Sequence, residues 1–342
     1  MMGKKLIAVL GITGTQGGSV ASRFLNHGDW RIRGITRNPG SEKAMAWAGR
    51  GVEIVKGDQD DVESLKAAFR GAHAIFAVTD WASNFLRVSE DEILQMKAAA
   101  AGRSIGEYAS DLELAQGINV ANAASDPNII STLEKFVFST LTAVKRISGG
   151  KYRHAYEFDS KAAVETYIRK ELLGLRDRLS TVTMGIYQET WRDIPAFRPH
   201  KQQDGTFTYV RLKCPGVHDA NPEVVALRDT GAFVAALVLH HPPGTDVLGA
   251  SEIISKPDYA TLWGRTIGVR ATVKDVSEEE YVRYVPEELR DTMVDLLKFF
   301  AEYGYTGGNA RVKTPMELGI ETTPLEVYFR GEDWSSVLKG ET

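Results

Sequence analysis

Cysteine is nearly absent from this chain of 342 residues, which contains only Cys214. An internal disulfide is therefore excluded, and so is a metal site built on a cysteine cluster. The histidines offer no replacement, because no metal-ligand spacing relates them to carboxylates or to Cys214: His154, His200, His218 and the pair His240–His241. We expect no metal site and a reducing compartment, either the cytoplasm alone or the nucleus as well.

Long apolar runs are also missing. The longest is FVAALVL at 233–239, far shorter than the roughly 20 residues needed to cross a bilayer. The start, MMGKKLIAVLG, resembles a signal peptide in its lysines and short apolar run. That run enters a glycine turn without a cleavage-type site, so we interpret it as a first strand and expect no membrane association.

An excess of basic charge is absent as well, since the net charge is −4. No global field therefore attracts the chain to nucleic acid, and no basic stripe interleaved with aromatic residues appears. The G-x-S-x-G motif of hydrolases is missing too. We expect neither hydrolase activity nor direct nucleic-acid binding. What remains is ordinary globular composition, 43% hydrophobic and 25% charged, in a length that suits one large or two modest domains.

Strand-like and helix-like segments alternate through the first part of the chain. This alternation predicts an α/β fold with a doubly wound parallel sheet. Residues 80–110 interrupt it as an insertion over the carboxyl ends of the strands. The expected strands are 5–10, 31–36, 52–57, 73–79, 134–141 and 180–187, and the expected helices are 15–28, 41–48, 61–71, 111–125 and 160–171.

The pattern loosens after Tyr187. An amphipathic helix is expected at 228–242, a last strand at 245–254 and short helices after 256. We therefore divide the chain into a dinucleotide-binding domain and a smaller α+β domain for a substrate or partner. The first comprises 1–187, with 226–255 returning to it, and the second comprises 188–225 and 256–342.

The glycines of GITGTQG, residues 11–17, join the first strand to the first helix. In such a unit Gly11 permits the tight turn, Gly14 lets the backbone approach a pyrophosphate, and Gly17 allows close helix–strand packing. The helix N-terminus offers free N–H groups to phosphates. The spacing, at the start of a repeating α/β pattern, favours a dinucleotide site over a purely structural turn. Hydrogen bonds at its rim are expected from Thr13, Thr15 and Gln16.

The end of the second strand reads ITRNPGSEK and has no carboxylate before Glu42. NAD sites usually place an acid there to bind the ribose 2′-hydroxyl. Arg37 can instead bind a 2′-phosphate through two hydrogen bonds, with Lys43 nearby. The alternative is a solvated surface arginine, but the position favours NADP(H).

Later strand ends add candidates for the same groove. Asp58 and Gln59 are expected beside the adenine, whereas Asp60 or Asp61 is expected to cap the next helix. Thr79 closes the fourth strand beside the groove. Trp81 is a candidate for the pocket wall, with packing under a loop as the alternative.

Four motifs together resemble the NmrA-like proteins, a branch of the atypical short-chain dehydrogenase/reductases: GITGTQGGSVASRFL, TRNP, VKGDQDD and FDSKAAVETYIRKE. The resemblance is strongest over 5–79 and 134–190. It implies a Rossmann-type domain, a smaller C-terminal domain, a cleft between them and NADP(H) binding. Some members of the family are redox sensors and transcriptional co-regulators, and others are reductases.

The wider superfamily uses a Tyr-x-x-x-Lys pair, whose lysine binds the nicotinamide ribose and lowers the pKa of the tyrosine. The resemblance places Lys161 at the lysine position and Glu157, instead of tyrosine, four residues earlier. We expect Tyr156, on a loop, or Glu157 to donate the proton, and Ser139 to bind a substrate carbonyl. The alternatives are that Lys161 only binds ribose, that Ser139 satisfies local backbone and that Tyr156 packs.

The resemblance also places Tyr187 and Gln188 beside the nicotinamide, and Thr140 beside Ser139. Two functions remain. One is an NADPH-dependent oxidoreductase acting on a small apolar or aromatic molecule, phenolic or polyketide-like, in a pocket walled by 80–110 and 187–210. The other is a non-catalytic NADP(H) sensor that acts through a protein partner. In either case we expect a monomer or homodimer.

Overall fold

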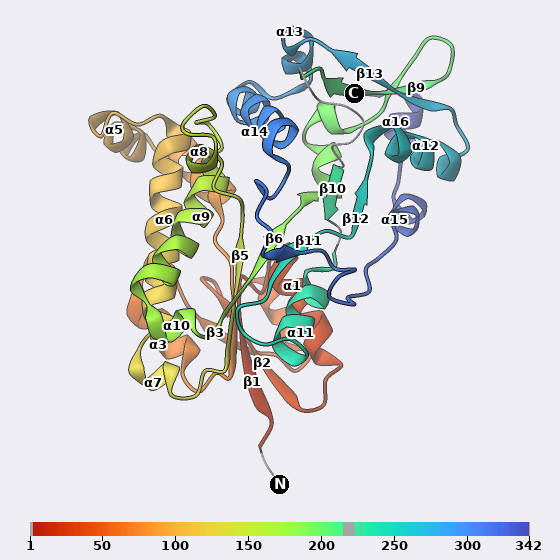
Figure 1. The fold of residues 1–342 in the computed structure, drawn as a ribbon. Coiled ribbons are helices and arrows are strands. Elements are labelled where there is room, and N and C mark those ends of the chain that lie inside the picture. Colours follow the sequence, from red (N-terminus) through yellow and green to blue (C-terminus); the bar gives the residue numbers. More distant parts are fainter. Residues whose placement is uncertain (1–2, 215–222, 227, 342) are drawn as a thin grey trace.

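An eight-stranded parallel sheet forms the centre of the computed structural model, which describes residues 3–214, 223–226 and 228–341 (Figure 1). His218 lies outside the described residues. The strand order is β14-β11-β6-β5-β4-β1-β2-β3. The strands are β1 (Lys5–Leu10), β2 (Trp30–Thr36), β3 (Glu53–Lys56), β4 (Ala74–Ala77), β5 (Lys135–Thr140), β6 (Leu179–Met184), β11 (Asp246–Gly249) and β14 (Val312–Lys313).

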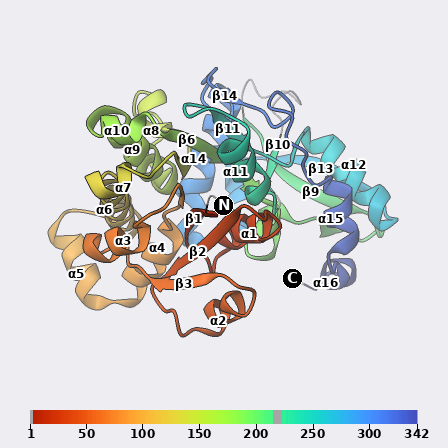
Figure 2. The same ribbon diagram turned by 90° about the horizontal axis from the view of Figure 1, so that it is seen from below.

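Helices cover both faces of this sheet (Figure 2). One face carries α3 (Val62–Phe69), α6 (Ile105–Ala124) and α9 (Tyr156–Glu171), and the other carries α1 (Thr15–Leu25), α2 (Glu42–Ala48) and α11 (Thr230–Leu239). Parallel strands buried on both faces need continuous apolar runs. The run KLIAVL of β1 supplies one, with all residues after Lys5 buried. The expected α/β, Rossmann-type doubly wound sheet is confirmed.

Helix α11 differs from the amphipathic helix expected at 228–242. Its sequence TGAFVAALVL is apolar on all sides, and seven of its residues are buried. It packs on the sheet beside α1, and a Cβ on Gly231 would lie 2.3 Å from the carbonyl oxygen of Ser19. Its partly exposed face carries Ala232, Ala236 and Leu239, which are all apolar, so no polar face marks the solvent side and the expected amphipathic pattern is absent.

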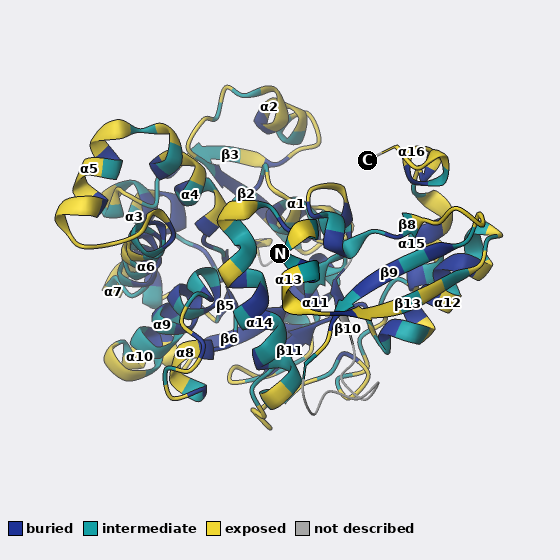
Figure 3. Cartoon of the chain, turned by 90° about the horizontal axis from the view of Figure 1, so that it is seen from above, coloured by how far each residue is buried: buried dark blue, intermediate teal, exposed yellow. Residues whose placement is uncertain are grey.

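The insertion expected at 80–110 is helical. It forms α4 (Trp81–Glu90) and α5 (Glu92–Ala100), and α6 then begins at Ile105 rather than near 111. The signal for that start is a capping box, in which Ser104 and Glu107 each bind the other's backbone N–H. Figure 3 shows α5 at the periphery with much of its surface exposed.

Two expected strands each divide between two sheets. The strand at 180–187 splits into β6 and β7 (Ile186–Tyr187), and the strand at 245–254 splits into β11 and β12 (Glu252–Ile254). β7 and β12 flank β10 (Glu223–Ala226) in a separate three-stranded sheet. The breaks fall at Gly185 and at 250–251, so the chain leaves the main sheet twice at its carboxyl edge.

The remaining elements gather beyond that edge (Figures 1 and 3). A third sheet, β13-β9-β8, packs with helices around an aromatic core that includes Trp191, Tyr209, Trp263 and Trp334. Its elements are β8 (His200–Lys201), β9 (Phe207–Leu212), β13 (Ala271–Val276), α12 (Lys256–Ile267), α15 (Leu325–Gly331) and α16 (Ser335–Lys339). Helix α14 (Arg290–Tyr303) stands between this region and the main sheet. No helix in the described part of the chain is long and apolar enough to cross a membrane.

Candidate functional site

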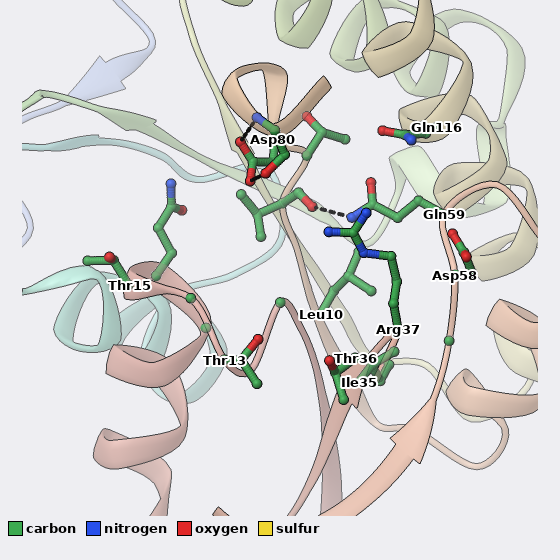
Figure 4. A pocket seen from close by; sticks show the side chains of 18 of the residues that line it. Leu10, Thr13, Thr15, Ile35, Thr36, Arg37, Asp58, Gln59, Asp80 and Gln116 are labelled. Atoms are coloured by element: carbon green, nitrogen blue, oxygen red, sulfur yellow. Dashed lines mark hydrogen bonds between the residues drawn. The ribbon is translucent and has the colours of Figure 1, made fainter. Parts of the chain in front are cut away.

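The loops after β1, β2, β3 and β4 surround a cavity of about 580 Å³, called here the polar groove (Figure 4). Every residue predicted from the sequence to bind the cofactor, except Lys161, lines it. These residues are Gly11, Thr13, Gly14, Thr15, Gln16, Gly17, Arg37, Lys43, Asp58, Gln59, Thr79 and Tyr187. They come from separate strand ends, which a parallel sheet brings to one edge.

The glycine turn leaves the start of α1 open to the groove. Gly11 has φ +69°, which favours glycine, and its carbonyl accepts the N–H of Gly14 at 2.9 Å. A Cβ on Gly17 would lie 2.3 Å from the Gly11 carbonyl oxygen, so no side chain fits there. Among the described residues, no side chain caps α1. The first N–H groups of the helix, with their partial positive charge, are therefore available to an anion.

Two exposed basic side chains line the other end of the groove. Arg37 extends from the end of β2 toward Gln59 (Figure 4), and Lys43 comes from the first turn of α2. Neither makes an ion pair or a side-chain hydrogen bond with another described residue. The two cations therefore lie beside the groove without a protein anion to neutralise them.

Several buried polar atoms of the groove lack a hydrogen-bond partner among the described residues. They are the Oε1 atoms of Gln16 and Gln59, the Thr79 hydroxyl and the Tyr187 hydroxyl. Gln59 uses its amide nitrogen to bind the Val78 carbonyl at 3.1 Å, which leaves only its oxygen free. Buried polar groups are nearly always satisfied, so these atoms indicate a polar ligand. Asp61, as expected, caps α3 instead.

A second cavity of about 740 Å³, called here the apolar cavity, adjoins the groove and shares Gln16, Thr79, Asp80 and Tyr187 with it. Its apolar walls come from α4, the β5 and β6 ends, residues 186–197 and α14. They include Trp81, Phe85, Leu86, Leu141, Phe158, Ile194, Phe197, Leu289, Met293, Leu296, Leu297 and Phe300.

These walls correct the expected pocket boundaries. Only the first residues of 80–110 and the first part of 187–210 line the cavity, because α5 lies outside it and Phe207 and Tyr209 belong to the aromatic core. The sequence did not predict that α14 and Tyr305 line the cavity. An amphipathic helix near the end of the chain shows which face is buried but not what that face covers.

Lys161, Glu157 and Ser139 also line the apolar cavity. The Lys161 ammonium forms an ion pair with Glu113 of α6, and the Ser160 hydroxyl donates to the other oxygen of the same carboxylate. Glu113 is 0% exposed. It was not predicted from the sequence, although a lone acid is unusual in a buried stripe of a helix. The buried stripe consists of Ala109, Glu113, Gln116, Gly117 and Val120.

The Glu157 carboxyl makes no hydrogen bond or ion pair with any described residue. Burial raises its pKa above the usual range for glutamate. The positive charge of Lys161 opposes that rise, while the negative charges of Glu113 and Asp80 add to it. Glu157 therefore retains its proton to a higher pH than an exposed carboxyl does, which is the property required of a general acid.

Tyr156 does not face the cavity, contrary to expectation. It lies in the first turn of α9 rather than on a loop, and its ring stacks on Trp81 with centroids 6.5 Å apart, against Gly106. Tyr156 is not among the residues that line the cavity, whereas Glu157, the next residue of α9, is. Trp81 is itself a wall of the cavity.

Tyr305, Gln188, Ser139 and Thr140 differ in their contacts near the cavity. Tyr305 donates its hydroxyl to the Met184 carbonyl at 2.6 Å, and burial raises its pKa well above that of free tyrosine. Gln188 is turned away from the cleft, because its amide donates to Tyr259 in the aromatic core at 2.5 Å. Ser139 and Thr140 are buried at the end of β5, where both line the cavity.

The sequence model of the NmrA-like family matches residues 3–334. The chain belongs to the NmrA-like family. Among its relatives is the NmrA-like oxidoreductase hkm9 of Aspergillus hancockii, 28% identical over 84% of this chain and 80% of the relative. The NmrA-like oxidoreductase FrzB of Cladobotryum is 28% identical over 91% of this chain and 88% of its own length.

Solved structures show the same fold as this NmrA-like chain. NmrA, a negative transcriptional regulator crystallised with NADP, has a TM-score of 0.69 and 20% identity over 96% of this chain and 95% of its own. The NADPH-dependent quinone oxidoreductase QOR2 of Escherichia coli, crystallised with NADPH, has a TM-score of 0.63 and 18% identity over 95% of this chain and 99% of its own. Within the described residues, no group of three or more His, Cys, Asp or Glu is placed to hold a metal ion.

Proposed function

We propose that this NmrA-like protein is an NADPH-dependent oxidoreductase that reduces a carbonyl or a conjugated double bond of an apolar, phenolic or polyketide-like molecule. The observation that carries the proposal is the junction of the two cavities. A groove with a free helix N-terminus and two unpaired cations opens beside an apolar cavity that holds Lys161 and Glu157. The NADP and NADPH bound in the related structures and the oxidoreductase names of the curated relatives support it.

The charged and hydrogen-bonding groups of the groove suit NADP(H). The start of α1 would hold the pyrophosphate, and Arg37 with Lys43 would hold the 2′-phosphate. Asp58 and Gln59 would border the adenine. The unpartnered Oε1 atom of Gln59 would find a partner on the adenosine part, and the unpartnered atoms of Gln16, Thr79 and Tyr187 would find partners on the ribose and nicotinamide. When bound, NADPH supplies the hydride.

The residues of the apolar cavity would complete the reduction. Glu157 would give its proton to the substrate oxygen, or to carbon in a conjugated system, and be reprotonated from solvent. Ser139 would donate a hydrogen bond to the substrate carbonyl, and Lys161 would bind the ribose. The aromatic and aliphatic walls would exclude water and select apolar substrates. We also propose the domain division stated above, with 1–187 and 226–255 binding the cofactor and 188–225 and 256–342 binding the substrate.

A second candidate is a sensor that binds NADP(H) and acts through a protein partner. It is favoured by the pairing of Lys161 with Glu113, which commits the ammonium to the protein, and by the absence of tyrosine at position 157. NmrA, which shares the fold, is described as a negative transcriptional regulator. Either function suits a cytoplasmic or nuclear protein that is a monomer or homodimer.

Measuring NADPH oxidation distinguishes the two candidate functions. Purified protein should oxidise NADPH in the presence of at least one compound from a panel of aromatic ketones and enones, followed by loss of NADPH absorbance. Glu157→Gln should reduce this rate strongly while NADPH binding persists. NADPH binding without turnover on any compound, together with capture of a protein that releases when NADP⁺ replaces NADPH, would favour the sensor.

A further inference from the structure

Glu157 and Lys161 stand four residues apart on α9, with the glutamate nearer the N-terminus. This spacing and order normally produce an ion pair on a helix surface. Here the pair does not form within the described structure. Lys161 binds Glu113, which is 48 residues away on another helix, and the Glu157 carboxyl is left without an ion pair. The favoured local partner has therefore been replaced by a distant one.

Glu113 holds the ammonium through a fixed arrangement. One of its oxygens accepts from Lys161 and the other from Ser160, so both bind the same turn of α9. The side chains are almost completely enclosed, with Glu113 0% and Lys161 7% exposed. A buried carboxylate that lost its cation would be strongly unfavourable, so the ion pair has little freedom to exchange.

We propose that Glu113 is a positioning residue, which withdraws the Lys161 ammonium from Glu157 and so leaves Glu157 as the uncommitted acid of the apolar cavity. The inference rests on the proposed reductase function, in which Glu157 gives up its proton to the substrate.

The charges around Glu157 support this role. The charges that act on its pKa are those of Lys161 on its own helix, Glu113 on α6 and Asp80 before α4. The Tyr187 and Tyr305 hydroxyls also lie near enough for the charge of Glu157 to raise their pKa values. Burial raises the pKa of Glu157, and Glu113 offsets the opposing effect of Lys161. Without the charge of Glu113, Lys161 would turn to Glu157, lower its pKa and hold it ionised at neutral pH.

The first test is the pH profile of turnover in Glu113→Gln. Turnover should require protonated Glu157, so the rate should fall at high pH as Glu157 loses its proton; this fall is the basic limb of the profile. In Glu113→Gln the basic limb should move to lower pH by about one unit or more, the shift typical of a carboxyl that gains a cation. The KM for NADPH should change by less than about twofold, since the polar groove is untouched. Glu113→Asp, which keeps the charge, should return the limb toward the wild-type position. A lower kcat with an unmoved limb would show a merely structural role and overturn the proposal.

The second test needs no turnover and measures urea unfolding at pH 8. Because the pKa of Glu157 is raised by folding, its ionised form opposes folding above the unfolded pKa. Glu157→Gln should therefore stabilise the wild type at pH 8 more than at pH 5. In the Glu113→Gln background this gain should vanish, because Glu157 would then pair with Lys161. An equal gain in both backgrounds would overturn the proposal.

A double variant keeps the test usable if Glu113→Gln alone fails to fold. Glu113→Gln combined with Lys161→Met removes both charges, so it leaves no buried ion without a partner. Glu157→Gln should stabilise this background at least as much as it stabilises the wild type, since the pKa-lowering charge of Lys161 is removed together with that of Glu113. A smaller gain would show that Glu113 raises the pKa of Glu157 by its own charge or packing rather than by withholding Lys161, and the proposal would fail. If the wild type oxidises no NADPH with any compound, the proposed function fails and the unfolding measurements alone decide this inference.

Discussion

The polar groove and the apolar cavity share four lining residues, but the chain builds them in different ways. Apart from Gln116 and Tyr187, the groove comes from residues 10–84, through short stretches that each follow a strand. The cavity draws its walls from residues 16 to 305, and α14 arrives from the far end of the chain. The groove depends on backbone shape and a few charges, whereas the cavity depends on packing between distant helices.

Lys161 tests the comparison most directly, because it lines the apolar cavity but would also bind the ribose of a cofactor held in the polar groove. Lys161→Met should reduce turnover by about 10²-fold or more, because the nicotinamide ribose would lose the cation that orients it, while NADPH affinity falls only modestly. Because this substitution would leave Glu113 unpaired, the measurement should be repeated with Glu113→Gln added. Lys170→Met, which replaces an exposed lysine on the same helix, is the control and should have no effect. Turnover that survives Lys161→Met would place the chemistry elsewhere, with Tyr187 the next residue to test.

The groove alone should be broken by Gly14→Val. Gly14 has φ −95° and ψ 175°, which valine adopts readily, and a Cβ there meets only the Gly11 carbonyl oxygen at 3.4 Å. The fold should persist, but the side chain would occupy the phosphate position and weaken NADPH binding by at least about a hundredfold. Titration calorimetry and circular dichroism would measure binding and helix content. Gly28→Val, where a Cβ meets nothing within 4 Å, should bind normally; retained binding in Gly14→Val would mean that the turn is structural.

Cofactor choice should depend on the groove's basic end and not on the cavity. The wild type should bind NADP(H) at least about tenfold more tightly than NAD(H), a difference of about 1.4 kcal/mol. Arg37→Ala should remove most of this preference, because it deletes the unpaired guanidinium beside the groove. Arg31→Ala, exposed on the same strand, should leave it intact. Equal affinities in the wild type would contradict the assignment of NADP(H).

The smallest effect is expected from the cavity wall that sequence analysis missed. Met293→Ala on α14 should raise the KM for an apolar substrate roughly threefold to tenfold, because it removes part of one apolar wall. NADPH affinity should not change. Met316→Ala, which replaces a methionine that is 89% exposed, is the matched control. A change in NADPH affinity with Met293→Ala would show that the two cavities are not separable in this way.

The difference between the two regions also explains what could be predicted from the sequence. The glycines, Arg37 and Thr79 follow strands that repeat with a clear period, and parallel strands bring their carboxyl ends together. Glu113 could not be assigned in this way, since its partner Lys161 lies on another helix and no local pattern joins them. The same limit applies to α14. Tyr156 was misplaced because four residues of helix start were assigned to a loop, and such an error rotates a side chain to another face.

The late position of α14 in the chain also sets an order of assembly during synthesis. A nascent chain that has reached residue 212 already carries every residue that lines the polar groove, but none of α14, and the edge strand β14 follows at Val312–Lys313. Domains generally fold from the N-terminus as the chain emerges, and bound ligand stabilises whatever has folded. A chain that ends before residue 290 would hold the groove residues without the last wall of the cavity. We expect a premature stop between residues 256 and 289 to keep every groove residue together with α11 and β11, and to lose the walls of the cavity that α14 and Tyr305 provide.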